Sequence, residues 1–106
     1  MKRSEILQRD KSLFNKQVDN YIEKCESIKD KVKSINNNDI GESEDTLLTN
    51  SIYATNIRIG STLENTISKV KAEREAANSR IDAEIAIAIA QERKELLSQK
   101  GIESEV

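Results

Sequence analysis

The sequence contains no proline, no histidine and no tryptophan, and it has only three glycines and one cysteine. The lack of proline and the scarcity of glycine remove the residues that most often end helices and form turns, so long helices are expected instead of a turn-rich sheet. Aromatic residues make up 3% and apolar residues 36% of the 106 positions, which leaves material only for a thin core. We predict a single all-α domain covering residues 1–106.

Histidine, the side chain that most often acts as a general acid or base, is missing. Without histidine there is no imidazole base or metal ligand, and the single Cys25 has no second cysteine for an internal disulfide. The sequence has no glycine-rich phosphate loop and no nucleophile next to a base. We therefore predict that the protein is not an enzyme and uses no metal or cofactor.

Charge and hydropathy set limits on partners and location. The 17 basic and 19 acidic residues are interleaved, so no basic face for nucleic acid is expected. Lys2 and Arg3 are followed by polar residues, which is unlike a signal peptide, and the longest apolar run, residues 85–90, is too short to span a bilayer. We predict a cytoplasmic protein without a membrane span, and export without a cleaved signal stays open as an alternative.

The first predicted helix covers residues 4–36, with Ser4 as its N-cap. Its apolar residues recur in steps of three and four, which is the heptad pattern of a helix that packs along one seam. The a positions of this pattern are Lys11, Val18, Cys25 and Val32, and the d positions are Leu7, Phe14, Tyr21, Ile28 and Ile35. Cys25 is thus predicted to be a buried thiol, and Lys11 to extend along the seam or to set its register.

Polar residues and Gly41 in the segment 37–43 predict the only loop, and a second helix is expected over residues 44–100, ending at Gly101. In this helix two apolar series repeat every eleven residues, which predicts a nearly straight seam. The series are Leu48, Ile59, Val70 and Ile81, and Ile52, Leu63, Arg74, Ile85 and Leu96. Because the spacing continues unchanged across Gly60, we predict an uninterrupted helix there.

Two helices joined by one loop predict an antiparallel hairpin with coiled-coil-like packing and a longer second helix. The expected hairpin core consists of Phe14, Val18, Tyr21, Ile28, Val32, Ile59 and Leu63. The first helix is too short to cover the end of the second, where alternating isoleucines and alanines leave apolar side chains on most sides. The predicted partner-binding residues on this overhang are Ile81, Ile85, Ile89 and Leu96.

A chain of about one hundred residues with two helices, a short loop containing Ile40 and Gly41, and no histidine resembles the small helical-hairpin proteins of bacterial type VII secretion. These are the WXG-type proteins and the accessory hairpins associated with LXG-type toxins. The loop has no tryptophan, and neither Tyr21 nor Tyr53 has an acidic residue four positions later, which departs from the WXG-type pattern and leaves the accessory class open. The resemblance implies pairing with a helical chain, such as the N-terminal region of an exported toxin.

Two functions from different classes follow. The first is a non-enzymatic helical protein-binding module that acts as a chaperone or adaptor for another helical protein, such as a secreted effector. The alternative is a coiled-coil scaffold or tether that assembles with copies of itself. A tight, monodisperse oligomer of the purified chain would favour self-assembly, whereas an aggregating or loosely folded chain would indicate a missing partner.

Overall fold

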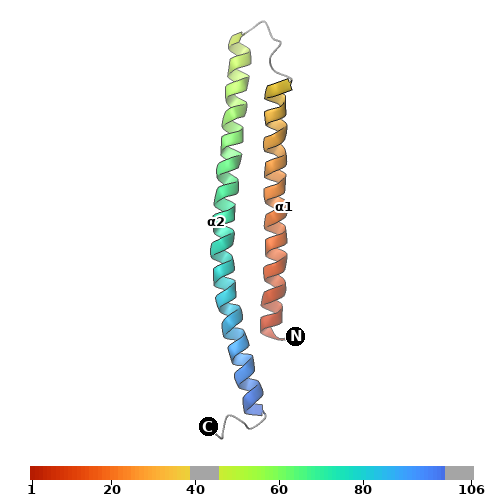
Figure 1. Cartoon of the computed structure of the whole chain (residues 1–106), viewed down its shortest axis with the longest axis vertical. Coiled ribbons are helices and arrows are strands. Elements are labelled where there is room, and N and C mark those ends of the chain that lie inside the picture. The colour runs from red at the N-terminus through yellow and green to blue at the C-terminus, as the bar shows by residue number, and fades with distance from the viewer. Residues whose placement is uncertain (39–45, 100–106) are drawn as a thin grey trace. The chain divides into compact units, whose positions relative to one another are not determined.

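The computed structural model describes residues 1–38 and 46–99, and it contains two helices, α1 at Arg3–Asn38 and α2 at Thr46–Gln99 (Figure 1). Of the described residues 98% are helical and none is in a strand, which confirms the all-α hairpin. The second helix is the longer one, with 54 residues against 36. An acidic residue, Glu5, lies in the first turn of α1, where a negative charge is favoured by the helix dipole.

The observed helix bounds differ from the predicted ones by a few residues. α1 begins one residue earlier and ends two residues later than expected, so residues 37 and 38 are helical instead of belonging to the loop. The rest of the predicted loop, the predicted start of the second helix at 44 and its predicted end at residues 100 and 101 lie outside the described residues. α2 passes through Gly60 without interruption, which confirms the predicted continuity.

The contacts divide the chain into two compact units, each with one segment of α1 and one of α2. Unit 1 combines Met1–Gln17 with Glu73–Val106, of which residues 73–99 of the second segment are described, and unit 2 is Val18–Ala72. In both units the helices are antiparallel, because later residues of α1 contact earlier residues of α2. A single domain over residues 1–106 stays a prediction.

Each unit has its own small apolar cluster. In unit 1, Leu7 packs with Ile85 and Ala88, and the half-buried Ile81 lies against them. The cluster of unit 2 consists of the buried Ile22, Cys25 and Ile67 with the half-buried Val18, Leu63 and Val70. Among the described residues no large side chain is completely buried, so neither cluster is a deep core. The prediction of a thin core and of a buried Cys25 thiol is confirmed.

The predicted register of α1 is wrong at the d positions. In unit 2 the inward-facing residues of α1 are Val18, Ile22, Cys25, Lys29, Val32 and Asn36. The a positions are therefore as predicted, but the other inner series lies one residue later than expected. Leu7, at the first predicted d position, is buried as expected. The other four residues predicted at d are exposed: Phe14 by 38%, Tyr21 by 48%, Ile28 by 49% and Ile35 by 42%. Of the four residues that take the inner positions instead, Ile22 is apolar, and the polar Asn15, Lys29 and Asn36 each have a partner on α2. A search for apolar residues does not detect these polar pairs.

The eleven-residue period of α2 holds only in the middle of the helix. Leu63, Val70 and Arg74 are half-buried in the seam, as predicted. Of the next members, Ile81 is half-buried and Ile85 is buried. The outer members are exposed: Leu48, Ile52, Ile59 and Leu96. The inward-facing residues of α2 in unit 2 follow the heptad steps of α1 instead, at Asn56, Gly60, Leu63, Ile67 and Val70. Ile59 is thus not part of the hairpin core, because its neighbour Gly60 occupies the inner position.

Candidate functional site

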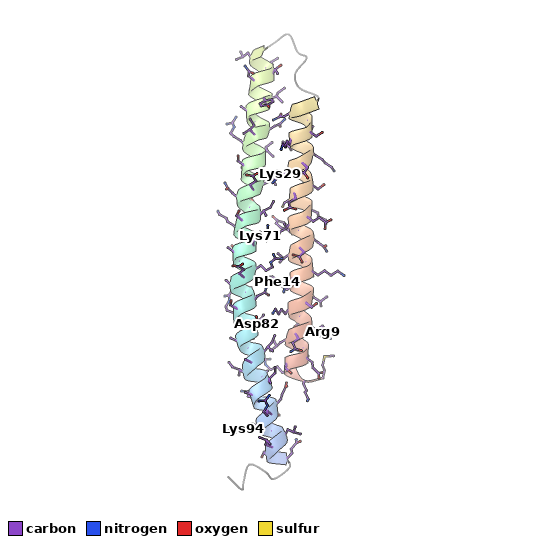
Figure 2. All side chains as sticks on the ribbon, viewed as in Figure 1. Arg9, Phe14, Lys29, Lys71, Asp82 and Lys94 are labelled. Carbon is purple, nitrogen blue, oxygen red and sulfur yellow. The ribbon has the colours of Figure 1, made fainter. Side chains whose placement is uncertain are left out.

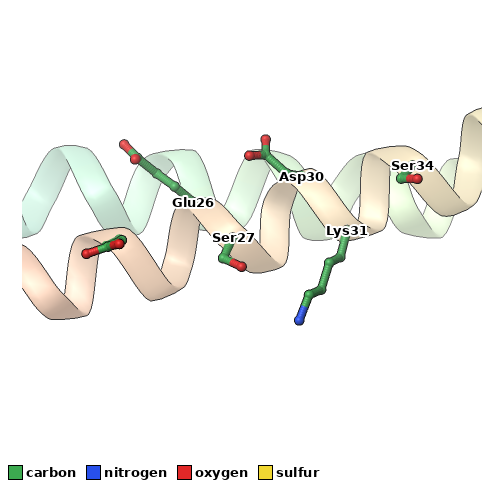
Figure 3. A pocket seen from close by; sticks show the side chains of 6 residues that line it. Glu26, Ser27, Asp30, Lys31 and Ser34 are labelled. Atoms are coloured by element: carbon green, nitrogen blue, oxygen red, sulfur yellow. The ribbon is translucent and has the colours of Figure 1, made fainter.

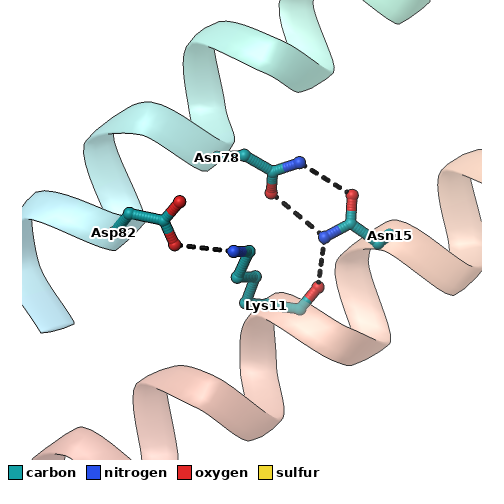
Figure 4. Close-up of polar contacts among 4 residues, drawn as sticks. All are labelled: Lys11, Asn15, Asn78 and Asp82. Atoms are coloured by element: carbon teal, nitrogen blue, oxygen red, sulfur yellow. Dashed lines mark hydrogen bonds and ion pairs between the residues drawn. The ribbon is translucent and has the colours of Figure 1, made fainter.

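The seam of unit 1 contains a polar layer that joins the two helices (Figure 4). Asn15 and Asn78 form a reciprocal amide pair, in which each Nδ2 donates to the other Oδ1 at 3.0 and 2.9 Å. The Nδ2 of Asn15 also donates to the carbonyl of Lys11 at 3.0 Å, and the Lys11 ammonium lies 2.6 Å from a carboxylate oxygen of Asp82. Such pairs fix which residues face each other, because a shifted register would leave the amides without partners.

A carboxylate of α2 caps the start of α1 in the same unit. The backbone N–H and the hydroxyl of Ser4 donate to the two oxygens of Glu92 at 2.9 and 2.7 Å. The backbone hydrogen bond, then the hydroxyl bond and the nearby Lys2 lower the pKa of Glu92, against a partial desolvation that raises it. Because α1 begins at Arg3, Ser4 lies inside the first turn and is not the predicted N-cap, and its side chain is buried.

The seam of unit 2 has its own polar contacts. Asn36 is buried, and its Nδ2 donates to the carbonyl of Tyr53 at 3.3 Å while its Oδ1 accepts from the Asn56 amide at 2.7 Å. The ammonium of Lys29 lies 3.5 Å from a carboxylate oxygen of Glu64. The apolar cluster of this unit lies along the same seam, so its two helices meet through both apolar and polar layers.

These polar seam residues were not found by sequence reasoning, which assigned Asn36 to the end of the helix and gave Asn15, Lys29, Asn78 and Glu92 no role. One signal was present. Asn15, Ile22, Lys29 and Asn36 are themselves spaced by seven residues, next to the apolar series. A polar seven-residue series parallel to an apolar one indicates a seam with specific pairs, although it does not reveal the partners.

The predicted partner-binding residues occupy two different environments in unit 1. Ile81 and Ile85 pack against Leu7, and Ile85 is only 9% exposed, so the expectation that α1 leaves them uncovered is wrong. Ile89 and Leu96 are exposed by 38% and 48%. α1 covers Ile81 and Ile85 because the extra length of α2 is divided between its two ends. In unit 2, α2 starts seven residues before Tyr53, and in unit 1 it continues seven residues beyond Glu92.

The residues predicted to form the hairpin core are also divided, between half-buried seam positions and exposed positions. Val18, Val32 and Leu63 are half-buried in the seam of unit 2, as expected. Tyr21, Ile28 and Ile35 form a second apolar series on α1 that repeats every seven residues outside the seam. We call this series the outer stripe. In unit 1, the side chain of Phe14, which is labelled in Figure 2, lines an apolar groove of about 220 Å³ together with Ala77 and Ile81.

The acidic residues of the described segments are distributed along both helices. No group of three or more histidine, cysteine or acidic residues among them is placed to hold a metal ion. The grooves on the described segments are shallow, and one of about 440 Å³ lies on the outside of α1 (Figure 3). No helix within the described ranges is long and apolar enough to cross a membrane.

Comparison of the chain with protein-family models, curated proteins and solved structures gives no match to any of them. The surfaces described above therefore carry the functional argument by themselves.

Proposed function

We propose that this protein is a non-enzymatic helix-binding module that acts as a chaperone or adaptor for another helical protein. The observation that carries the proposal is the outer stripe, in which Tyr21, Ile28 and Ile35 repeat every seven residues yet are 42% to 49% exposed. A seven-residue apolar repeat is the pattern by which one helix packs on another. Because the seam to α2 uses a different series, the outer stripe is available for an additional helix.

The thin core favours the same proposal. Among its described residues, each unit has only three buried apolar residues. Isolated exposed apolar side chains are common on proteins, whereas apolar side chains that recur along one face mark an interaction surface. Covering the stripe would add apolar burial that the chain does not achieve alone. The resemblance to type VII secretion hairpins supports an exported helical protein as the partner, with self-assembly as the alternative.

Mass measurement of the purified chain and of mixtures tests the proposal. The chain is co-expressed with helical proteins encoded by neighbouring genes, and the products are analysed by size-exclusion chromatography with light scattering. We expect a complex of defined stoichiometry with one of them, and a gain in thermal stability over the chain alone. A tight, monodisperse homo-oligomer that binds none of the candidate proteins would instead support the self-assembling scaffold.

A further inference from the structure

The two faces of unit 2 differ in chemistry, and a groove between its helices shows which residues share a face. The groove, of about 400 Å³, is lined by Asp30 and Lys33 of α1 together with Ile57, Ser61 and Glu64 of α2. On both helices each of these residues directly follows a seam position. Residues that directly precede a seam position must therefore lie together on the opposite face, because one residue turns a helix by about 100°.

On α1 this preceding face is formed by the outer stripe. α2 adds a second stripe with steps of three and four residues. Its members are Ile52, Thr55, Ile59, Thr62 and Thr66. The hydroxyls of the three threonines each donate at 2.9 Å to the carbonyl four residues earlier, so their polar groups are satisfied within α2. We call the surface formed by Tyr21, Ile28, Ile35, Ile52 and Ile59 the outer face.

The charges flanking the outer face are basic. Lys24 and Lys31 alternate with the apolar residues of the outer stripe, and Lys69 continues the series on α2. Arg58 extends toward the outer face, because its Nη2 lies 3.5 Å from the hydroxyl of Thr55. None of these four basic side chains forms an ion pair with a carboxylate within the described part of the chain.

The opposite side of α1 is acidic. The residues that follow its seam positions are Asp19, Glu23, Glu26 and Asp30, before Lys33. Figure 3 shows Glu26 and Asp30 extending from one side of α1 and Lys31 from the other. Within the described residues, unit 2 thus has one apolar face with a basic border, and the acidic residues of its α1 segment lie on the other side of that helix.

We propose that the outer face docks an amphipathic helix of another protein whose apolar stripe is flanked by aspartate and glutamate. The inference rests on the proposed helix-binding function and specifies the chemistry of the partner. Apolar side chains of the incoming helix lie between the stripes of α1 and α2, and its acidic flanks meet Lys24, Lys31, Arg58 and Lys69. Complementary charge at the border of an interface accelerates association and selects the partner.

A second copy of this chain is a poorer occupant of the outer face. Two copies joined through this face would bring basic borders against basic borders, and like charges disfavour such a pairing. The acidic side of α1 offers charge of the right sign but no apolar stripe to cover the isoleucines. A membrane surface is also disfavoured, because three of the residues on the α2 stripe are threonines and the outer face has no tryptophan or phenylalanine.

The test uses the full chain and two synthetic helical peptides with identical apolar heptads, one flanked by glutamate and one by lysine. Binding is measured by fluorescence anisotropy at low salt. We expect the glutamate-flanked peptide to bind about tenfold more tightly, and the difference to shrink toward about 1 M NaCl as the charges are screened. Equal affinities for the two peptides would overturn the inference about acidic flanks while leaving the helix-binding function in place.

Matched variants locate the site. Ile28→Gln with Ile59→Gln is expected to weaken binding at least about tenfold, whereas Ile57→Gln on the opposite face leaves it unchanged. Lys24→Glu with Lys31→Glu is expected to reverse the preference between the peptides, and Glu23→Lys with Glu26→Lys to preserve it. If Ile57→Gln loses binding while the Ile28→Gln, Ile59→Gln variant keeps it, the assignment of the site is wrong.

Two further measurements separate the other occupants. If sedimentation shows that the wild-type chain is an oligomer and the Ile28→Gln, Ile59→Gln variant is a monomer, a second copy covers the outer face and the inference is wrong. Binding of phosphatidylglycerol vesicles that is lost in the same variant would also overturn it in favour of a membrane. If neither the peptides nor any co-expressed helical protein binds, the proposed function fails as well.

Discussion

At the scale of single residues, Asn36 shows how a polar side chain can be buried at a helix seam. Its amide donates to the Tyr53 carbonyl and accepts from Asn56, so both of its polar groups have a partner on α2. We expect Asn36→Ala to lower the free energy of unfolding by about 1 to 3 kcal/mol, because the Asn56 amide loses its acceptor. Urea denaturation measures the change. The exposed Asn20→Ala should change the free energy of unfolding by less than about 0.5 kcal/mol. If the two variants lose equal stability, the hydrogen bonds of Asn36 do not stabilise the fold.

Glu92 gives the seam of unit 1 a dependence on pH. Its pKa is lowered in the folded protein, mainly by the backbone N–H of Ser4. A carboxylate with a depressed folded pKa contributes stability above its unfolded pKa, and this contribution disappears as the pH falls through the folded pKa. We expect Glu92→Gln to lower the thermal midpoint at pH 7, and the gap to wild type to be smaller at pH 3, which lies below the ordinary pKa of a glutamate. A gap that is the same at both pH values would contradict this role.

At the scale of helices, truncating a residue of the inner series of α1 is expected to cost much more stability than truncating a residue of the outer series. Ile22 is buried with Cys25 and Ile67, whereas Ile28 is about half exposed. Ile22→Ala is expected to lower the free energy of unfolding by about 2 to 4 kcal/mol, because it leaves a cavity in the cluster of unit 2. Ile28→Ala is expected to cost less than about 1 kcal/mol. Chemical denaturation of the two variants tests the register, and a larger loss for Ile28 would restore the heptad first predicted from the sequence.

Gly60 is the position at which α2 is easiest to strengthen. A Cβ added there meets no atom within 4 Å, and the helix continues on both sides. Alanine restricts the unfolded chain and favours the helix, so Gly60→Ala should raise the free energy of unfolding by about 0.5 to 1 kcal/mol. Thermal denaturation followed by circular dichroism gives the measurement. Gly60→Pro serves as the opposite control and should cost about 3 kcal/mol or more, and destabilisation by alanine would indicate a break in the helix.

At the scale of the whole molecule, the end of α2 in unit 1 offers a second apolar surface. Ile89 and Leu96 are exposed, while Ile85 is needed for packing against Leu7. We expect Ile89→Glu with Leu96→Glu to reduce association with the native partner, or with further copies in the alternative function, at unchanged helicity. Sedimentation and circular dichroism test this, with the exposed Lys94→Glu as a control for added negative charge. Undiminished association would exclude this end of α2 from the binding surface.

The sequence by itself determined the number, type and approximate length of the helices. Helical hydrogen bonds join residues four apart, so the lack of proline and the apolar steps of three and four residues were sufficient to locate them. The continuity across Gly60 and the burial of Cys25 followed from the same local spacing.

Only the tertiary structure decided which of two adjacent seven-residue series of α1 faces α2. Phe14, Tyr21, Ile28 and Ile35 are the more apolar series, yet the inner positions belong to Asn15, Ile22, Lys29 and Asn36. The cost of burying Asn15 depends on Asn78, which is 63 residues away along the chain. Polar burial is tolerated where a distant partner satisfies it, and for that reason the apolar outer stripe remains exposed.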